Sequence, residues 1–108
     1  MTLNLPGPVA VYFAADQGDS RTLSECFTED AIVKDEGHTH SGRAAIREWK
    51  ENVSAKYEYT CEPRTCEQQG EKIIVTSRLT GNFPGSPVDL RFLFKVAGGK
   101  IVSLEITP

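Results

Sequence analysis

Residues 27–49 read FTEDAIVKDEGHTHSGRAAIREW, and the change of pattern within this stretch decides the fold. The segment 31–35 is short, begins with apolar residues and contains β-branched ones, which predicts a strand that ends in a polar segment. Residues 43–57 predict an amphipathic helix, with the Ser-Gly pair at 41–42 as its cap and charged residues such as Lys50 on the polar side. The apolar positions of this helix are Ala45, Ile46, Trp49 and Val53.

The segment before this stretch predicts two helices. Residues 8–19 start with a proline, which the first turn of a helix tolerates, and Gly18 is expected to end the first helix. Asp19 or Ser20 can cap a second, shorter helix. The first helix has Val9, Tyr12, Phe13 and Asp16 at helical spacing, and the second has Leu23, Cys26 and Phe27.

The segment after the long helix predicts four strands. Apolar and polar residues alternate from residue 57 until Pro63 disturbs the strand, and again in 72–81, 88–96 and 100–106. The turns between these strands are short, so consecutive strands must pair antiparallel as a meander. We therefore predict an α+β fold with three N-terminal helices packed against a curved, mostly antiparallel sheet.

The composition narrows the classes of function. The 108 residues predict a single domain over residues 1–108. The net charge is -3 and no run of Lys or Arg is present, so nucleic acid is not an expected partner. No apolar run reaches the roughly 20 residues that span a bilayer. The initial MTLNLPGP does not resemble a signal peptide, so we expect a cytoplasmic protein that has no membrane partner.

The three cysteines are Cys26, Cys61 and Cys66, an odd number, and free thiols are expected. Cys61 and Cys66 lie five residues apart in an extended stretch, which predicts that they point to opposite faces. This spacing does not favour a zinc site.

Several segments carry a resemblance to a known family. They are the helices broken at QGD (17–19), CFTEDAIVKDEG (26–37), THSGRAAIREW (39–49) and GGKIVSLEI (98–106). In order and spacing these segments resemble the nuclear transport factor 2-like superfamily, and within it the bacterial SnoaL-like and ketosteroid-isomerase-like proteins. The resemblance covers essentially the whole chain. It implies a cone-shaped fold whose mouth opens on an apolar pocket, and a homodimer formed through the sheet.

Asp35 is the candidate base. In isomerase-like members of the family, an aspartate in a valine-x-aspartate setting at the end of the first strand moves a proton next to a carbonyl, and VKD supplies this pattern with Val33 and Asp35. A carboxylate in an apolar cup has a raised pKa, which suits proton transfer near neutral pH. The alternative is that Asp35 accepts hydrogen bonds from the turn backbone or from the following helix.

The resemblance also implies donors for a developing oxyanion. The position of the family's tyrosine falls at Val11, one residue before Tyr12, and one helical step rotates a side chain by about 100°. The position of the partner aspartate falls near Arg91, with Asp89 two residues away, which argues against steroid-type isomerisation. Arg91 can stabilise a carboxylate or an enolate by its charge, or it can be a surface or dimer-interface arginine paired with Glu or Asp on a neighbouring strand.

Three aromatic residues are candidate walls of a pocket. Trp49 and Phe92, like Tyr12, either contact the ligand or pack in the core. Phe83 lies between Gly, Asn and Pro residues, so it is expected at a rim, at a dimer contact or as a hairpin anchor.

His38 and His40 are the two histidines of the chain, and in an extended segment both point the same way. They can bind a metal together with Asp35 or Glu36, although one short turn is a poor cage. His40 is instead a candidate acid/base partner of Asp35, or it is solvated or packs on a neighbouring aromatic residue.

The leading hypothesis is a protein that binds a small apolar or carbonyl-bearing molecule and needs no cofactor. It either only binds this molecule or transfers a proton on it, as an isomerase, cyclase or dehydratase does, with Asp35 as the base. The alternatives are a non-catalytic dimeric interaction module and a metal-dependent enzyme that uses His38 and His40.

Overall fold

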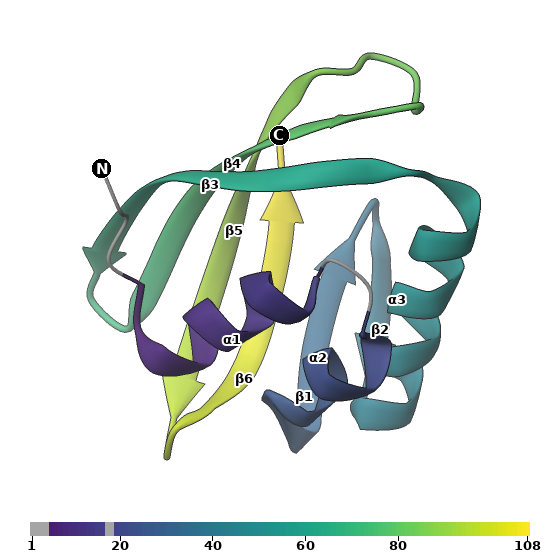
Figure 1. Cartoon of the computed structure of the whole chain (residues 1–108). Helices are drawn as coiled ribbons and strands as arrows, with labels where there is room; N and C mark the ends of the chain where they lie inside the picture. The colour runs from purple at the N-terminus through teal and green to yellow at the C-terminus, as the bar shows by residue number, and fades with distance from the viewer. Residues whose placement is uncertain (1–4, 17–18) are drawn as a thin grey trace.

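The computed structural model describes residues 5–16 and 19–108, whose arrangement is shown in Figure 1. The helix stop expected at Gly18 lies outside the described residues. In chain order the elements are α1 (Gly7–Ala15), α2 (Ser20–Glu25), β1 (Phe27–Asp35), β2 (His38–Ser41), α3 (Arg43–Lys56), β3 (Tyr59–Gln69), β4 (Lys72–Gly81), β5 (Val88–Ala97) and β6 (Lys100–Thr107).

The six described strands form one sheet in the order β2-β1-β6-β5-β4-β3. The last four strands pair antiparallel in chain order, so the predicted meander is confirmed. β1 pairs parallel with β6 and antiparallel with β2. The α+β class is confirmed, and the sheet curves around α1 and α2 in Figure 1. The three described helices are not one N-terminal block, because β1 and β2 precede α3.

The strand β2 is not in the sequence prediction. A two-residue turn at Glu36 and Gly37, both with positive φ, folds the chain back so that Asp35 pairs with His38 and Val33 with His40. Such turns match the twist of a hairpin, and glycine accepts positive φ without steric cost. The polar sequence of β2 fits its place at the edge of the sheet, where its side chains are exposed or half-buried.

A bulge in β3 corrects the prediction for two cysteines. β3 does not end at Pro63 but continues to Gln69, with a shift of register between Pro63 and Thr65. The extra residue reverses the alternation of side chains, so Cys61 and Cys66 both pack against the core. The prediction of opposite faces is therefore wrong, whereas the prediction that the cysteines are free is confirmed.

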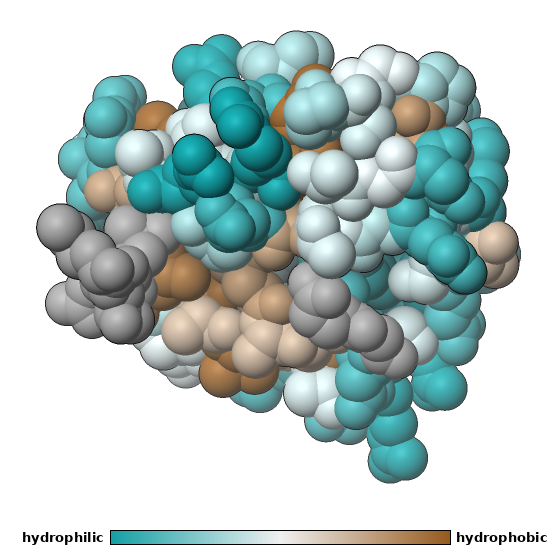
Figure 2. All heavy atoms as spheres, turned by 45° about the horizontal axis from the view of Figure 1, so that its top comes forward, coloured by the Kyte–Doolittle hydropathy of each residue, from teal (hydrophilic) through white to brown (hydrophobic). Residues whose placement is uncertain are grey.

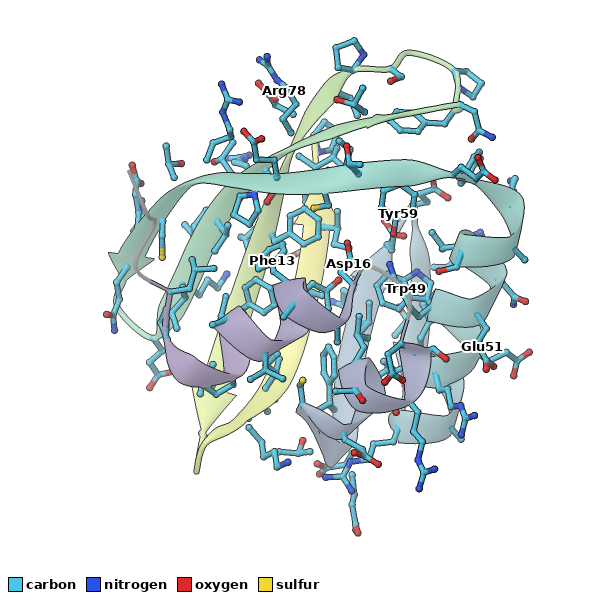
Figure 3. The ribbon with its side chains drawn as sticks, viewed as in Figure 1. Phe13, Asp16, Trp49, Glu51, Tyr59 and Arg78 are labelled. Atoms are coloured by element: carbon cyan, nitrogen blue, oxygen red, sulfur yellow. The ribbon has the colours of Figure 1, made fainter. Side chains whose placement is uncertain are left out.

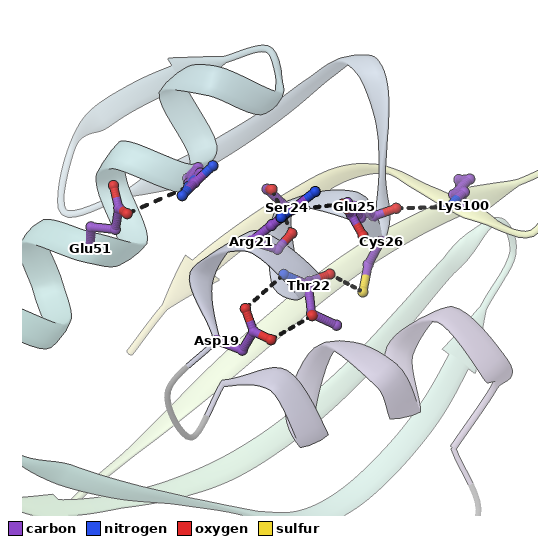
Figure 4. Close-up of polar contacts among 9 residues, drawn as sticks. Asp19, Arg21, Thr22, Ser24, Glu25, Cys26, Glu51 and Lys100 are labelled. Carbon is purple, nitrogen blue, oxygen red and sulfur yellow. Dashed lines mark hydrogen bonds and ion pairs between the residues drawn. The ribbon is translucent and has the colours of Figure 1, made fainter.

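The second helix is shorter than the sequence pattern suggests. Asp19 caps it by accepting from the backbone N–H of Thr22 at 3.0 Å and from the Thr22 hydroxyl at 2.6 Å (Figure 4). Phe27, expected on this helix, is the first residue of β1 and is fully buried there. Lys100 at the start of β6 donates to the carbonyl oxygen of Glu25 at 2.7 Å, which ties the end of α2 to the sheet (Figure 4).

Aromatic side chains fill the core between α1 and the concave face of the sheet. Tyr12 and Phe13 of α1 pack edge-on against Phe94 of β5, with ring centroids 5.3 and 5.8 Å apart. Phe92 lies two residues before Phe94 on the same inner face, as the alternating pattern of β5 predicts. Such aromatic pairs each contribute about 0.5–1.5 kcal/mol beyond the area that they bury.

The outer side of α1 is apolar as well. Val11 is 47% exposed, and in Figure 2 hydrophobic side chains gather between the two groups of grey atoms, where α1 lies. Among residues 5–16 and 19–108, no helix combines the length and hydropathy needed to cross a membrane.

Gly81 at the end of β4 allows β3 to approach closely. A Cβ added at Gly81 would lie 2.2 Å from the carbonyl oxygen of Glu58 and 2.6 Å from Cβ of Tyr59. Because these neighbours are backbone or fixed to it, a larger residue would displace the start of β3. Gly81 therefore helps to position Tyr59.

Candidate active site

A cavity of about 270 Å³ opens between α1, α3 and the concave face of the sheet. Its volume is close to the lower end of the roughly 300–1,000 Å³ range of small-molecule sites. Most of its wall is apolar or aromatic. Its charged groups come from Asp16, Asp35, Glu36 and Lys50, and Tyr59 is among the residues that add a hydroxyl group. The apolar wall includes Tyr12, Trp49, Val53, Tyr57, Phe83, Leu90, Phe92 and Ile106.

Asp35 reaches this cavity from the last position of β1. Its Oδ2 accepts a hydrogen bond of 3.0 Å from Nε1 of Trp49 on α3. Burial raises the pKa of the Asp35 carboxyl above its ordinary value, although the Trp49 hydrogen bond works in the opposite direction. The neighbouring Glu36 raises this pKa further and His40 lowers it. A carboxyl group with a raised pKa in an apolar pocket can both take and return a proton.

The position of Trp49 depends on how α3 begins. Gly42, with φ of 87°, is the N-cap residue and its N–H donates to the carbonyl oxygen of Ala31 at 2.8 Å. The expected side-chain cap from Ser41 is wrong, because Ser41 is the last residue of β2 and α3 has no side-chain cap bond. Arg43 donates through Nε to the carbonyl oxygen of Phe27 at 2.8 Å, so the first turn of α3 is fixed to β1.

The structure corrects the predicted place of Lys50. The sequence pattern predicts the polar side of the helix, but the Lys50 side chain is 2% exposed and lines the cavity. Lys50 Nζ forms an ion pair with Asp16 Oδ1 and donates a hydrogen bond to the hydroxyl oxygen of Tyr59. Figure 3 shows Asp16, Trp49 and Tyr59 gathered between α1, α3 and β3.

A signal for this cluster is present in the sequence. Lys50 lies four residues after Ile46 and three before Val53, so it belongs to the apolar stripe of α3. Asp16 likewise continues the apolar stripe of α1 and is 8% exposed. Opposite charges on two apolar stripes indicate a buried ion pair, because neither charge can be buried alone without a large cost.

Lys50, Tyr59 and the nearby Cys61 all have raised pKa values. Burial opposes the charged form of Lys50, but Asp16 and Tyr59 outweigh it and the Lys50 pKa is raised. Burial, followed by the charge of Asp16, raises the pKa of the Tyr59 hydroxyl. Burial also raises the pKa of the nearby Cys61 thiol to about 12. At neutral pH the cavity therefore presents an ammonium, a phenol and an unreactive thiol.

The structure brings together most of the residues expected to contact a ligand. Tyr12, Trp49 and Phe92 line the cavity with Asp35. Arg91 does not join them, because it is exposed on the opposite face of β5. Asp89, on the same face, is exposed and pairs with Arg78 at 3.0 Å instead of facing the ligand.

His40 and Phe83 lie at the edge of the cavity. The His40 ring is 5.9 Å from the ring of Trp49, and His40 lines a shallow depression together with Asp35. The Phe83 ring packs edge-on against Tyr57 at 6.1 Å. Asn82 holds this loop to β3 by exchanging two hydrogen bonds of 3.0 Å with the backbone of Glu58.

The metal hypothesis gains no support. In the part of the chain that the structure describes, no three side chains of His, Cys, Asp or Glu are placed to hold a metal ion. His38 is exposed in β2, and its cross-strand neighbour Asp35 binds the indole of Trp49.

Comparison with known proteins identifies relatives of the whole chain. The SnoaL-like domain family matches residues 9–104. A crystal structure of a candidate polyketide cyclase from Sinorhizobium meliloti is 41% identical, with a TM-score of 0.91 and 95% of each chain covered. No curated protein matches this chain.

Two further solved structures share the fold. The epoxide hydrolase/cyclase-like enzyme SalBIII, with a role in forming the pyran ring of the polyether salinomycin, is 28% identical over 93% of this chain and 86% of its own, with a TM-score of 0.76. A Catenulispora acidiphila protein with a ketosteroid isomerase-like fold, solved in complex with trimethylamine, is 23% identical over 97% of this chain and 87% of its own, with a TM-score of 0.85.

Replacing Lys50 tests the buried ion pair. We expect Lys50→Met to lower the free energy of unfolding by about 3–5 kcal/mol, because Asp16 is then buried without its cation. The double variant Asp16→Asn/Lys50→Met removes both charges and should recover most of this loss. Urea denaturation measures both values, and a double variant as unstable as Lys50→Met would contradict the pairing.

Replacing Asp35 tests its raised pKa. Because the folded-state pKa is raised, the stability linked to this group is complete below the ordinary carboxyl pKa and is lost as the pH rises through the folded pKa. We expect Asp35→Asn to raise the Tm at pH 7, and the gain over the wild type to vanish below about pH 4. Asp30→Asn, an exposed carboxyl on the same strand, should leave the Tm unchanged. A lower Tm for Asp35→Asn at pH 7 would argue against a destabilising Asp35 carboxylate.

Proposed function

Because the chain belongs to the SnoaL-like family of the nuclear transport factor 2-like superfamily, we propose that its cavity binds a small carbonyl-bearing molecule and transfers a proton on it, with Asp35 as the base. The cavity is then the pocket expected inside a cone-shaped fold. The observation that carries the proposal is the Asp35 carboxylate, which lines an apolar cavity, is held by Trp49 and has a raised pKa.

The proton transfer needs no group that the chain does not supply. The Asp35 carboxylate takes a proton from the carbon next to the carbonyl, and the electron pair of the broken C–H bond forms an enolate. Asp35 then returns the proton to another carbon of a conjugated enolate, or the enolate carbon attacks a second carbonyl, closes a ring, and the alkoxide that forms takes the proton back from Asp35. The first outcome is isomerisation and the second is cyclisation, so one base serves both reactions.

The Trp49 hydrogen bond orients the base. An indole N–H donates and cannot accept, so it stabilises the carboxylate and leaves the second oxygen of Asp35 for the substrate. His40 beside Trp49 is proposed as the partner that exchanges protons between Asp35 and water at the edge of the cavity.

The comparisons support a cyclase or an isomerase more than a module that only binds partners. One relative is a candidate polyketide cyclase and another is an epoxide hydrolase/cyclase-like enzyme. An interaction module would need no interior cavity with a desolvated carboxyl group. We therefore keep the non-catalytic module as the alternative outcome of the experiment on Asp35.

A homodimer through the sheet is part of the proposal. Ile32, Ile74 and Leu93 point away from the core on the outer face of β1, β4 and β5, and Ile32 is 38% exposed. Apolar side chains on an outer sheet face are suited to a second copy of the chain.

Solvent exchange tests the base directly. With 2-acetylnaphthalene in D₂O, we expect the protein to accelerate deuterium exchange of the acetyl methyl protons, followed by proton NMR. Asp35→Asn should slow this exchange by about 10²-fold or more. The wild-type rate should fall as the pH falls through the raised pKa of Asp35, because only the carboxylate accepts a proton. Asp30→Asn is the matched control, and equal rates for Asp35→Asn and wild type would refute the role of Asp35.

Light scattering after size exclusion tests the dimer. We expect the wild type to have twice the mass of one chain and Leu93→Glu to have the mass of one chain, because the new charges would face each other across the two-fold axis. Val11→Glu changes an apolar residue on α1 that is more exposed than Leu93, and this variant should remain a dimer. A wild-type mass of one chain would rule out this interface.

A further inference from the structure

The hydroxyl group of Tyr59 is placed to hold a ligand oxygen. Its oxygen accepts from Lys50 Nζ, so its lone pairs face the ammonium and its hydrogen points elsewhere. Toward Asp16 Oδ1 the hydroxyl donates over 3.5 Å, longer than the about 2.5–3.0 Å of ordinary O–H···O bonds. This hydrogen is therefore weakly held, in a residue that lines the cavity.

We propose that Tyr59 donates this hydrogen to the carbonyl oxygen of the ligand, and that the cavity selects neutral ketones or aldehydes over carboxylates. This inference rests on the proposed function, in which Asp35 removes the proton beside that carbonyl. Tyr59 acts as a catalytic residue because it touches the reacting oxygen, and Lys50 is a positioning residue that acts through Tyr59.

The two halves of the site meet on α3. Trp49 and Lys50 are successive residues, and about 100° of helical rotation separates their directions. Trp49 holds the base Asp35 on β1, and Lys50 holds Tyr59 at the start of β3. A ligand between them can contact Tyr59 through its oxygen and Asp35 through the adjacent C–H bond. The backbone of Tyr59 is also fixed by its close contact with Gly81 on the neighbouring strand β4.

The proposed reaction needs a group that stabilises the negative charge on the carbonyl oxygen. When Asp35 takes the proton, the C–H electron pair forms the carbon–carbon double bond and the carbonyl electrons move to oxygen. The hydrogen bond from Tyr59 strengthens as this negative charge develops, and no proton leaves Tyr59. The nearby ammonium polarises the phenol, while the raised pKa of each group keeps both protonated.

The same charges set the preference for neutral ligands. Asp16 already neutralises Lys50, so the ammonium is not free to pair with an anion. Asp35 and the exposed Glu36 also line the cavity, so its wall carries three carboxyl groups and one ammonium. A carboxylate ligand would lose its hydration and meet net negative charge, whereas a ketone loses little hydration and gains one hydrogen bond.

Three matched two-ring probes test the inference: 2-acetylnaphthalene, 2-ethylnaphthalene, which lacks the oxygen, and 2-naphthoate, which carries a charge. Calorimetry or probe fluorescence at pH 7.5 measures their dissociation constants. We expect the ketone to bind about threefold to tenfold tighter than the hydrocarbon, the effect of one hydrogen bond, and at least about tenfold tighter than the carboxylate. Tyr59→Phe should bring the ketone-to-hydrocarbon ratio to about one.

A vibrational measurement separates donation by Tyr59 from a structural effect. The carbonyl stretching band of bound 2-acetylnaphthalene should lie at lower frequency than in an apolar solvent, and Tyr59→Phe should remove this shift. Asp16→Asn/Lys50→Met keeps the phenol and removes the ammonium, so a smaller shift is expected. An unchanged shift in this double variant would refute the role of Lys50.

Asp35→Asn separates this inference from the proposed function. It should slow deuterium exchange by about 10²-fold or more but keep the ketone-to-hydrocarbon binding ratio and the carbonyl shift, because Tyr59 is intact. Retention of both in Tyr59→Phe, or tighter binding of 2-naphthoate than of the ketone, would overturn the inference even if Asp35 proves to be the base. Loss of exchange in Tyr59→Phe with normal binding of the hydrocarbon would support it.

Discussion

The buried ammonium of Lys50 is the constraint on which the site depends. An amino group that is 2% exposed must have partners, and the chain supplies them from Asp16, before the sheet, and Tyr59, after the long helix. The end of α1, the middle of α3 and the start of β3 must therefore converge on one point. The cavity lies where these elements converge, bounded by the sheet that connects them.

Two carboxyl groups in this cavity have different surroundings and therefore suit different tasks. Asp16 faces a cation and serves to balance its charge. Asp35 faces an indole N–H, and burial makes its ionised form unfavourable. Groups of the same chemistry take different roles when their environments separate their affinities for the proton. An ion pair of this kind adds little stability compared with apolar residues of similar size, so its presence in a cavity is better explained by function.

Features set by neighbouring residues could be predicted from the sequence, and features set by contacts between distant residues could not. Strands with regular alternation and the helix around Trp49 could be predicted, because period and turn residues are local signals. The strand β2 could not be predicted, because its sequence is polar and lacks the apolar face by which strands are recognised. Asp35 could be placed by its position after a strand. Lys50 required knowledge of Asp16 and Tyr59, which lie 34 and 9 residues away. The faces of Cys61 and Cys66 depended on a bulge that one proline only suggests.

The hydrogen bond from Trp49 to Asp35 has an optical consequence. Trp49 is the single tryptophan of the chain, and its indole N–H is bound to the carboxyl group at the reacting end of the cavity. The tryptophan emission of this protein therefore comes from one indole whose surroundings change when the carboxyl group gains a proton or when a ligand replaces water beside it. The wild-type chain contains its own spectroscopic reporter, located at the group whose protonation matters most.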